Sequence, residues 1–208
     1  MNKSANNNQV TIAGEVVSKF IFNHEVYGEG FYTTDIRVRR ESGIDDVIPV
    51  MISERLMDVT QDYSGQYIAI LGQFRSYNYN KGEKRKLQLH VFAIEAEIVE
   101  EMFVMTNAIY LDGYICKEPT YRVTPLGREI ADIILAVNRP YSKSDYIPCI
   151  FWGRNARYVE NLQVGEKLKV EGRIQSREYT KILEDGTTEV RVAYEVSINR
   201  FEVVTDES

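Results

Sequence analysis

The stretch "GRIQSREY" occupies residues 172–179, and the stretch "GQFRSYNY" occupies residues 72–79. Both read Gly, any residue, an apolar residue, any residue, Ser, two further residues and Tyr, and they lie one hundred residues apart. A chain of 208 residues has room for two domains of about 100 residues each. The spacing therefore indicates a duplicated domain.

Other short matches occur in the same order and at nearly the same offset. They are "VTIAGEV" with "IYLDGYI" (residues 10–16 and 109–115), "VIPVMI" with "YIPCIF" (residues 47–52 and 146–151), and the turns "NKGEK" and "EDGTT" (residues 80–84 and 184–188). We therefore divide the chain into residues 1–104 and residues 105–208. The joint near "EEMFVMTN", residues 100–107, contains no Gly, Pro or Ser, so we expect a short and fairly stiff connection.

Each repeat shows the same series of expected elements. Three strands come first, then a short helical stretch, a long fourth strand and, after a Gly-containing turn, a fifth strand. The helical stretches are "SERLMDV" and "GRNARYVENL", at residues 53–59 and 153–162. This pattern predicts an all-β protein with one short helix per repeat, folded as two tandem five-stranded Greek-key barrels of the OB-fold type. Pro49 and Pro148 fall inside the third strands and should lie at an edge or a bulge, because proline lacks a backbone donor.

Composition excludes several classes of protein. The chain is 44% hydrophobic and 27% charged, which is ordinary for a globular protein. It has neither a run of 18 apolar residues nor an apolar leader, so we expect no membrane partner and a cytoplasmic, nucleoid-associated location. Its two cysteines, Cys116 and Cys149, suit a reducing compartment. The net charge of −6 argues mildly against a nucleic-acid partner, but local patches decide contact with phosphates.

The fourth strand of the second repeat separates a core face from a surface face, because side chains alternate along a strand. Leu168, Val170 and Ile174 should point inward. The opposite face carries Lys169, Glu171, Arg173, Gln175, Arg177 and Tyr179. On the third strand, Tyr146 and Trp152 share one face, while Ile147, Cys149 and Phe151 take the other. Aromatic rings among cations are what a single-strand binder needs, because rings stack on bases and cations follow the phosphates. Ordinary cross-strand packing is the other interpretation of each ring.

The first repeat differs at the corresponding positions. Val47 and Ser53 stand where the second repeat has Tyr146 and Trp152. Arg75, Tyr77 and Tyr79 share an outward face, and that face begins with Ala69 and Leu71. A strand that is apolar on both faces is usually covered on both. We therefore expect the first repeat to pack against the second repeat or another subunit, and to keep a weaker groove around Tyr77 and Tyr79.

The second repeat resembles the bacterial single-stranded DNA-binding protein (SSB) family over nearly all of residues 107–204. The residues that carry the resemblance are "TPLGREIADIILAVNRPY" (124–141), "DYIPCIFWGRNA" (145–156), "VGEKLKVEGRIQSREY" (164–179) and "AYEVSINRFE" (193–202). The first repeat matches only through its glycine pattern and "GQFRSYNY".

The resemblance implies a function and a set of residues. DNA would stack on the aromatics at the matching positions, which are Tyr141, Tyr146, Trp152 and Tyr179. Nearby candidates for phosphate contact are Arg139, Lys143, Arg154, Arg173 and Arg177, each of which is read equally well as a solvated surface charge. In the first repeat, Arg75, Tyr77 and Tyr79 are the weaker candidates. Two fused copies imply a homodimer with four barrels.

One departure from the family concerns partner enzymes. Typical members continue into a long tail with an acidic tip that recruits replication and repair enzymes. This sequence stops seven residues after Phe201, at "EVVTDES", without a terminal Pro-Phe. We therefore do not expect a recruiting role, and an accessory, plasmid or phage binder fits as well as a host protein.

No pattern indicates catalysis, a cofactor or a metal. His24 lies in an expected polar loop, His90 reads as a surface or edge residue of a strand, and no nucleophile triad, phosphate-binding Gly loop or Cys/His cluster is present. The pair Asp45 and Asp46 reads as solvated turn charge. Two other functions stay open: a primosome-type OB-fold adaptor that binds replication proteins, and an RNA-binding OB protein.

Overall fold

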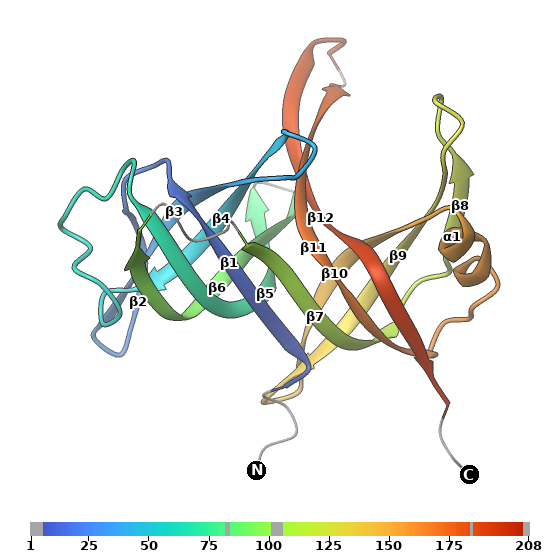
Figure 1. Cartoon of the computed structure of the whole chain (residues 1–208), viewed down its shortest axis with the longest axis horizontal. Coiled ribbons are helices and arrows are strands. Elements are labelled where there is room, and N and C mark those ends of the chain that lie inside the picture. Colours follow the sequence, from blue (N-terminus) through green and yellow to red (C-terminus); the bar gives the residue numbers. More distant parts are fainter. Residues whose placement is uncertain (1–5, 82–83, 101–105, 184, 206–208) are drawn as a thin grey trace.

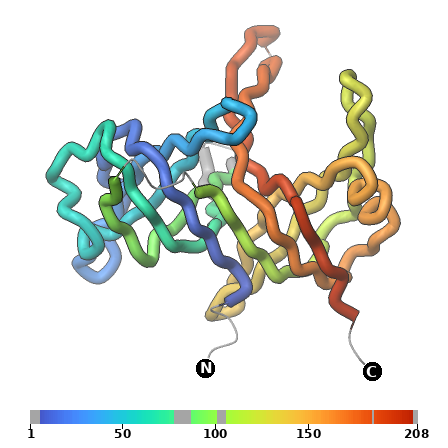
Figure 2. Tube along the Cα trace, in the orientation of Figure 1, coloured from blue at the N-terminus to red at the C-terminus, as the bar shows by residue number. Residues whose placement is uncertain are grey.

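The computed structural model describes residues 6–81, 84–100, 106–183 and 185–205, with no side chain described for residues 78–81 and 84–86. Two barrels lie side by side (Figures 1 and 2). Barrel 1 contains β1 (Asn8–Val16), β2 (Ile21–Val26), β3 (Glu29–Arg39), β4 (Asp45–Ser53), β5 (Tyr67–Lys81) and β6 (Lys84–Val99). Barrel 2 contains β7 (Thr106–Ile115), β8 (Thr120–Val123), β9 (Glu129–Arg139), β10 (Lys143–Trp152), α1 (Arg154–Val159), β11 (Lys167–Ile182) and β12 (Thr188–Val204).

Both barrels close in the same way. In barrel 1 the strands follow the order β3-β4-β6-β5-β1, and β1 also pairs with β3; barrel 2 repeats this with β9-β10-β12-β11-β7 and a β7–β9 pairing. The β4–β6 and β10–β12 pairings are parallel, and they begin at Val50 and Cys149. Pro49 and Pro148 directly precede these pairings, where the strand has a neighbour on one side only. The predicted tandem OB-fold is confirmed.

Two details of the predicted element list are wrong. Each barrel has a sixth strand, β2 or β8, which extends β3 or β9 as an outer hairpin. The helix predicted at residues 53–59 is absent, and turns occupy residues 54–56 and 59–60. Local side chains explain the turns: Asp58 Oδ1 accepts a bond from the Thr60 backbone N–H at 3.1 Å, and Ser53 Oγ accepts one from the Arg55 N–H at 3.1 Å. In barrel 2 the corresponding helix forms as α1, with Ala156 and Val159 buried.

The two barrels are joined by their first strands. β1 and β7 pair antiparallel from Asn8–Leu111 to Ala13–Thr106, so one twelve-stranded sheet runs through both barrels (Figure 1). The predicted boundary between residues 104 and 105 falls in the segment 101–105, which lies outside the described residues.

In each barrel an asparagine side chain bonds the backbone of β5 or β11 beyond the point where that strand pairs with β1 or β7. β1 pairs with β5 only as far as Val10, and Asn8 then bonds through its side-chain amide to Phe74, with Nδ2–O at 2.7 Å and N–Oδ1 at 2.8 Å. Asn107 bonds Ile174 in the same way, at 2.6 and 2.9 Å. A side-chain amide thus satisfies backbone groups that β1 or β7 no longer reaches.

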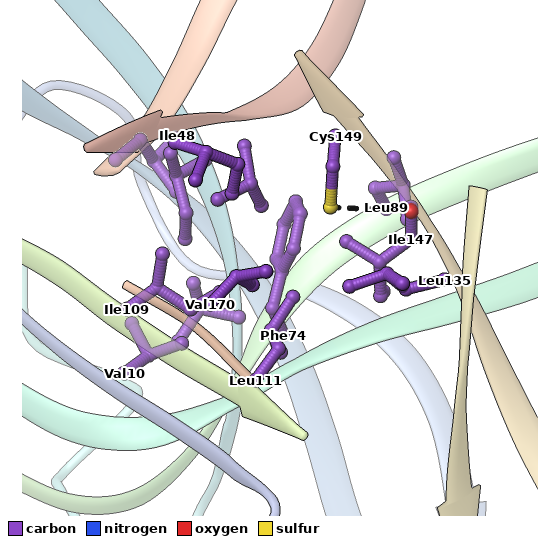
Figure 3. Packing of buried hydrophobic residues seen from close by; sticks show 14 of the residues in the cluster. Val10, Ile48, Phe74, Leu89, Ile109, Leu111, Leu135, Ile147, Cys149 and Val170 are labelled. Carbon is purple, nitrogen blue, oxygen red and sulfur yellow. Dashed lines mark hydrogen bonds between the residues drawn. The ribbon is translucent and has the colours of Figure 1, made fainter. Parts of the chain in front are cut away.

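The core is shared between the barrels. One cluster of buried apolar side chains includes residues from the five main strands of each barrel. Figure 3 shows Phe74 of β5 among Val10, Leu111 and Val170. Phe74 and Leu111 are fully buried. Since neither barrel has a core of its own that stops at the junction, we expect the two to unfold together.

The repeated glycine of the opening motif sits at a bulge in both barrels. The register of β5 against β6 shifts between Leu71 and Gly72, and that of β11 against β12 shifts between Glu171 and Gly172. A Cβ atom at Gly72 would collide with the Phe92 carbonyl oxygen, and one at Gly172 with the Ser197 carbonyl oxygen. Only glycine allows this close approach of neighbouring strands.

Candidate nucleic-acid interface

The third strand of barrel 2 presents two aromatic side chains on one face. Tyr146 is 44% exposed, and Trp152 is half-buried, six residues further along β10, or about 20 Å. The Trp152 indole Nε1–H donates to Ser197 Oγ at 3.0 Å, which fixes the ring against β12. Ile147, Cys149 and Phe151 lie on the opposite face, as predicted, and are buried in the core.

Two further predicted aromatics lie on the surface of barrel 2. Tyr141 stands in the β9–β10 turn with φ of 63°, and its side chain is 95% exposed. A non-glycine residue at positive φ is uncommon. Tyr179 lies near the end of β11, 37% exposed, opposite Arg191 of β12. Barrel 2 thus brings all four predicted aromatics to its surface.

Three of the five predicted cations in barrel 2 are well exposed. Lys143 lies beside the Tyr141 turn, and Arg154 begins α1 just after Trp152. The Arg177 side chain is 54% exposed, its guanidinium carbon lies 5.9 Å from the Tyr179 ring centroid, and Glu195 is a loose partner at 3.9 Å. These three side chains are free to meet phosphates along the aromatic surface.

The other two cations hold ion pairs. Arg139 Nη1 lies 3.3 Å from Asp145 Oδ1, and Arg173 Nη1 lies 3.4 Å from Asp46 Oδ2 in barrel 1. Their side chains are 30% and 31% exposed. Burial lowers the pKa of Arg173, as does the nearby charge of Arg40, while Asp46 opposes the shift. Both arginines therefore belong to the contact between the barrels.

The serine of the repeated motif makes that contact. Ser76 of β5 donates its N–H to Asp145 Oδ1 at 2.8 Å and accepts the Tyr146 N–H on its Oγ at 2.8 Å. We call this junction A. Ser176 of β11 makes the equivalent bonds to Asp46 and Val47, at 2.7 and 3.2 Å, which we call junction B. This role could not be predicted from local sequence patterns, since the partner of each serine lies in the other repeat.

Both junction carboxylates are buried. Asp46 and Asp145 are each 0% exposed. The interpretation of Asp46 as solvated turn charge is therefore wrong, because Arg40 pairs with it through two bonds and Ser176 closes over it. Within the part of the chain that the structure describes, Asp145 Oδ2 is the buried side-chain oxygen or nitrogen that has no hydrogen-bond partner.

The prediction for Gln175 also needs correction. It was expected on the exposed face of β11, but it is 6% exposed and donates to Glu195 Oε1 at 2.6 Å. The bulge at Gly172 and the wrap of β12 enclose this position. Leu168, Val170 and Ile174 are buried, as expected.

In barrel 1, the predicted residues occupy different settings. Tyr77 is 58% exposed, beside junction A. The Arg75 guanidinium carbon lies 3.8 Å from the centroid of the Phe92 ring. Burial lowers the Arg75 pKa to about 10, assisted by the charge of Arg139 and opposed by Asp145. The side chain of Tyr79 lies outside the described residues.

Sequence reasoning missed an aromatic column in barrel 1. The His24 and Phe31 rings are stacked with centroids 5.0 Å apart and planes 12° apart, and Phe31 lies 5.8 Å from Phe92. His24 is in a strand rather than a loop, and His90 is partly buried in β6 rather than on the surface. Alternation along β6 places Phe92 on the same face as His90, and His90 pairs with Arg75 of β5. This alternation is the signal in the sequence that points to Phe92.

The outer face of barrel 1 is exposed within the chain. Leu71 is 46% exposed and Ile94, at the neighbouring bulge, is 51% exposed. Barrel 2 therefore does not cover this face, which removes one of the two expected packing partners. The corresponding face of barrel 2 carries ion pairs, Lys169 with Glu202 at 3.6 Å and Glu171 with Arg200 at 3.9 Å.

Metal and membrane sites were also considered. No group of three or more His, Cys, Asp or Glu side chains that could hold a metal ion occurs among the described residues. Over those same residues, no helix is both long enough and apolar enough to cross a membrane.

Sequence comparison extends over barrel 2. Residues 106–204 match the single-strand binding protein family. A single-stranded DNA-binding protein of Halalkalibacterium halodurans is 40% identical over 82 residues, covering 36% of this chain and 49% of that protein. Single-stranded DNA-binding protein A of Bacillus subtilis is 39% identical over 82 residues, covering 36% and 48%. The chain thus spans about half the length of these relatives.

Structural comparison extends over both barrels. The crystal structure of wild-type single-stranded DNA binding protein from Thermus aquaticus matches 97% of this chain and 94% of its own chain, with a TM-score of 0.77 and 21% sequence identity. At this identity the likeness establishes the shared fold of two joined barrels.

Proposed function

We propose that the protein binds single-stranded DNA without sequence specificity, because residues 106–204 match the single-strand binding protein family. The process it serves is replication, recombination or repair of DNA in the cytoplasm, and the protein acts by binding rather than by catalysis. Barrel 2 supplies most of the stacking, and barrel 1 supplies assembly and a weaker groove.

The aromatic surface of barrel 2 is the observation that carries the proposal. Tyr146, Trp152 and Tyr179 are each partly exposed on strands of one barrel, and Tyr141 extends the surface at a turn. Every base has a flat π face, so such rings hold bases of any sequence. The hydrogen bond from Trp152 to Ser197 keeps that ring in place before DNA arrives, so little ordering is needed on binding.

The exposed cations complete the surface. The Arg177 guanidinium carbon lies 5.9 Å from the Tyr179 ring centroid, and Lys143 and Arg154 follow Tyr141 and Trp152 closely in the chain. Phosphates that follow the stacked bases displace counterions when they meet these side chains. The overall charge of −6 does not prevent this, because the cations are local to the rings.

A variant with a matched control tests the proposal. Tyr179→Ala should weaken binding of a fluorescein-labelled oligo-dT by about 1–3 kcal/mol, the usual effect of losing one stacking ring. Tyr158→Ala is the control, because Tyr158 is 56% exposed on α1, contacts the Phe201 ring and is not one of the four proposed stacking rings, so it should leave the dissociation constant unchanged. Fluorescence anisotropy measures both. Equal dissociation constants for Tyr179→Ala and the unmodified protein would refute the assignment.

The same assay separates the alternatives. The adaptor function predicts weak binding with a shallow salt dependence, whereas DNA binding predicts a steep decrease in affinity with salt. Competition by oligo-rU that equals competition by oligo-dU would favour a binder that does not distinguish RNA from DNA, since the 2′-hydroxyl is the group that separates them.

We further propose that the chain forms a homodimer with four barrels. Leu71 and Ile94 leave an apolar patch on barrel 1, next to Ala69. The corresponding face of barrel 2 is occupied by ion pairs. A second copy of barrel 1 is an apolar partner of matching shape, and a two-fold arrangement uses the same patch on both chains.

A further inference from the structure

We propose that barrel 1 carries a second base-stacking site, formed by the rings of Phe92, Phe31 and His24 and reached from barrel 2 across Arg75. The inference rests on the proposed function, because its ligand is the same single-stranded DNA. It assigns to barrel 1 a part of the binding path that Tyr77 and Tyr79 alone do not describe.

The first argument is the geometry of the column. The Arg75 guanidinium lies over Phe92 at 3.8 Å, Phe92 and Phe31 are 5.8 Å apart, and Phe31 is stacked on His24 at 5.0 Å. Four planar groups from β2, β3, β5 and β6 therefore follow one another across the barrel surface. His24 is exposed and Phe31 and Phe92 are partly exposed, so the column ends at solvent, where a base can continue it.

The second argument is the strand that borders the column. All six residues of β2 are exposed, although Ile21, Phe22 and Val26 are among them. Phe22 is 57% exposed, and Tyr27 in the adjoining turn is fully exposed. An exposed cluster of apolar and aromatic side chains on a small protein usually marks a binding surface. Next to a cation and stacked rings, the occupant with matching chemistry is a nucleobase.

The third argument is the convergence of positive charge from both barrels. His90 of β6 has its pKa lowered to about 4, first by burial and then by the charges of Arg75, Arg139 and His24. The His90 pKa is thus lowered by a cation of barrel 1, Arg75, and by a cation of barrel 2, Arg139. The charge of Asp145 acts on Arg75 in the opposite direction to that of Arg139. The surroundings of junction A are therefore cationic, as a path for phosphates requires.

The fourth argument is continuity with the surface of barrel 2. The charges of Asp145, the residue before Tyr146, and of Arg139 both act on Arg75, so the Arg75 guanidinium lies near this end of β10. A DNA strand that leaves the Tyr146 ring can therefore reach Arg75 and then Phe92. At junction B no such path exists on the described side chains, because Gln175 and Ser197 occupy the positions of Arg75 and Phe92 and are bonded to Glu195 and Trp152.

The two barrels thus place their central ring on different strands. Barrel 2 has Trp152 on its third main strand over the small Ser197. At the position of Trp152, barrel 1 has the small Ser53, which donates its hydroxyl to Glu29 Oε1 at 2.5 Å. At the position of Ser197, barrel 1 has the ring of Phe92. Each barrel therefore keeps one large ring in this region. Barrel 1 can stack a base on Phe92 although it has Ser53 in place of a tryptophan.

A relocated tryptophan tests the proposal directly. Trp152 is the only tryptophan of the chain, so Trp152→Phe has no indole fluorescence, and Trp152→Phe/Phe92→Trp reports on barrel 1 alone. We expect oligo-dT long enough to span both barrels to quench the double variant, with anisotropy showing that it binds. Binding without quenching would overturn the proposal. If the unmodified protein fails to bind oligo-dT, the proposed function itself fails, which anisotropy shows separately.

A second variant avoids any change inside the barrel. His24→Ala alters an exposed side chain, so the melting temperature should stay the same. We expect at least about 5-fold weaker binding of an oligo-dT that spans both barrels, and unchanged binding of one that covers only barrel 2. Gln66→Ala, at an exposed residue of barrel 1 just before β5, is the matched control and should bind both oligonucleotides normally. Equal affinities of His24→Ala and Gln66→Ala for the long oligonucleotide would contradict the proposal.

Discussion

The two junction carboxylates occupy equivalent places but differ in what they hold, so matched substitutions test the account of how the barrels join. Asp46 accepts hydrogen bonds from Arg40 Nε at 2.7 Å, from the Ser176 N–H at 2.7 Å and from Arg173 Nη1 at 3.4 Å. Asp46→Asn removes the charge that neutralises both arginines and places an amide donor against them. We expect a marked loss of stability.

The magnitude follows from burial. Removing one partner of a buried ion pair costs about 3–5 kcal/mol. The Arg40 and Arg173 side chains are 19% and 31% exposed, so water compensates in part, and we expect about 3 kcal/mol for Asp46→Asn. In Asp145→Asn, one oxygen still accepts the Ser76 N–H, and the amide replaces Oδ2, which has no hydrogen-bond partner on the described residues. The variant also removes the charge that faces Arg139 Nη1 at 3.3 Å, and the Arg139 side chain is 30% exposed. The expected cost is therefore about 2 kcal/mol, less than for Asp46→Asn, because Asp46 faces two arginines.

Urea unfolding of both variants provides the measurement. Far-ultraviolet circular dichroism and Trp152 fluorescence should give coincident transitions, because the barrels share one core. The difference in midpoint, multiplied by a common slope, gives the two free energies. Equal costs, or a larger cost for Asp145→Asn, would refute the reasoning that Asp46 is the fully paired carboxylate.

Three further outcomes are expected. The pKa of His90 is about 4 in the folded protein and about 6.5 in the unfolded chain, so the unfolded state gains the proton first as the pH falls. The free energy of unfolding should therefore fall by about 2 kcal/mol from pH 7 to pH 5. Urea unfolding of His90→Gln should no longer show this loss. Leu71→Arg should convert a dimer to single chains by light scattering without lowering the melting temperature, and an unchanged mass would remove this patch as the interface. Lys143→Ala should reduce the slope of log affinity against log salt by about 0.7, the contribution of one phosphate contact, and an identical slope would place Lys143 off the path.

Much of the fold could be predicted because it depends on local patterns. The duplication was visible in repeated glycines, and Gly72 and Gly172 are repeated because a bulge brings two backbones too close for a side chain. Alternation along β10 correctly separated Ile147, Cys149 and Phe151 from Tyr146 and Trp152. The helix at residues 53–59 failed because short polar side chains, such as Asp58, bond their own backbone in turns.

The features that were missed depend on residues far apart in the sequence. Ser76 and Ser176 looked like ordinary strand residues, and their partners lie 69 and 130 residues away. Asp46 looked solvated because its neighbours are polar, whereas the other barrel covers it. The aromatic surface of barrel 2 was found because its rings lie on single strands. The column of barrel 1 was not, because four strands build it.

The central claim is that single-stranded DNA stacks on the surface of barrel 2. Titration with oligo-dT, followed by Trp152 fluorescence at low and moderate salt, tests it most directly, because this indole lies between Tyr146 and Arg154 on that surface. The account predicts strong quenching that weakens as salt is raised. Fluorescence that does not change while anisotropy reports bound oligonucleotide would place the DNA elsewhere and contradict the claim.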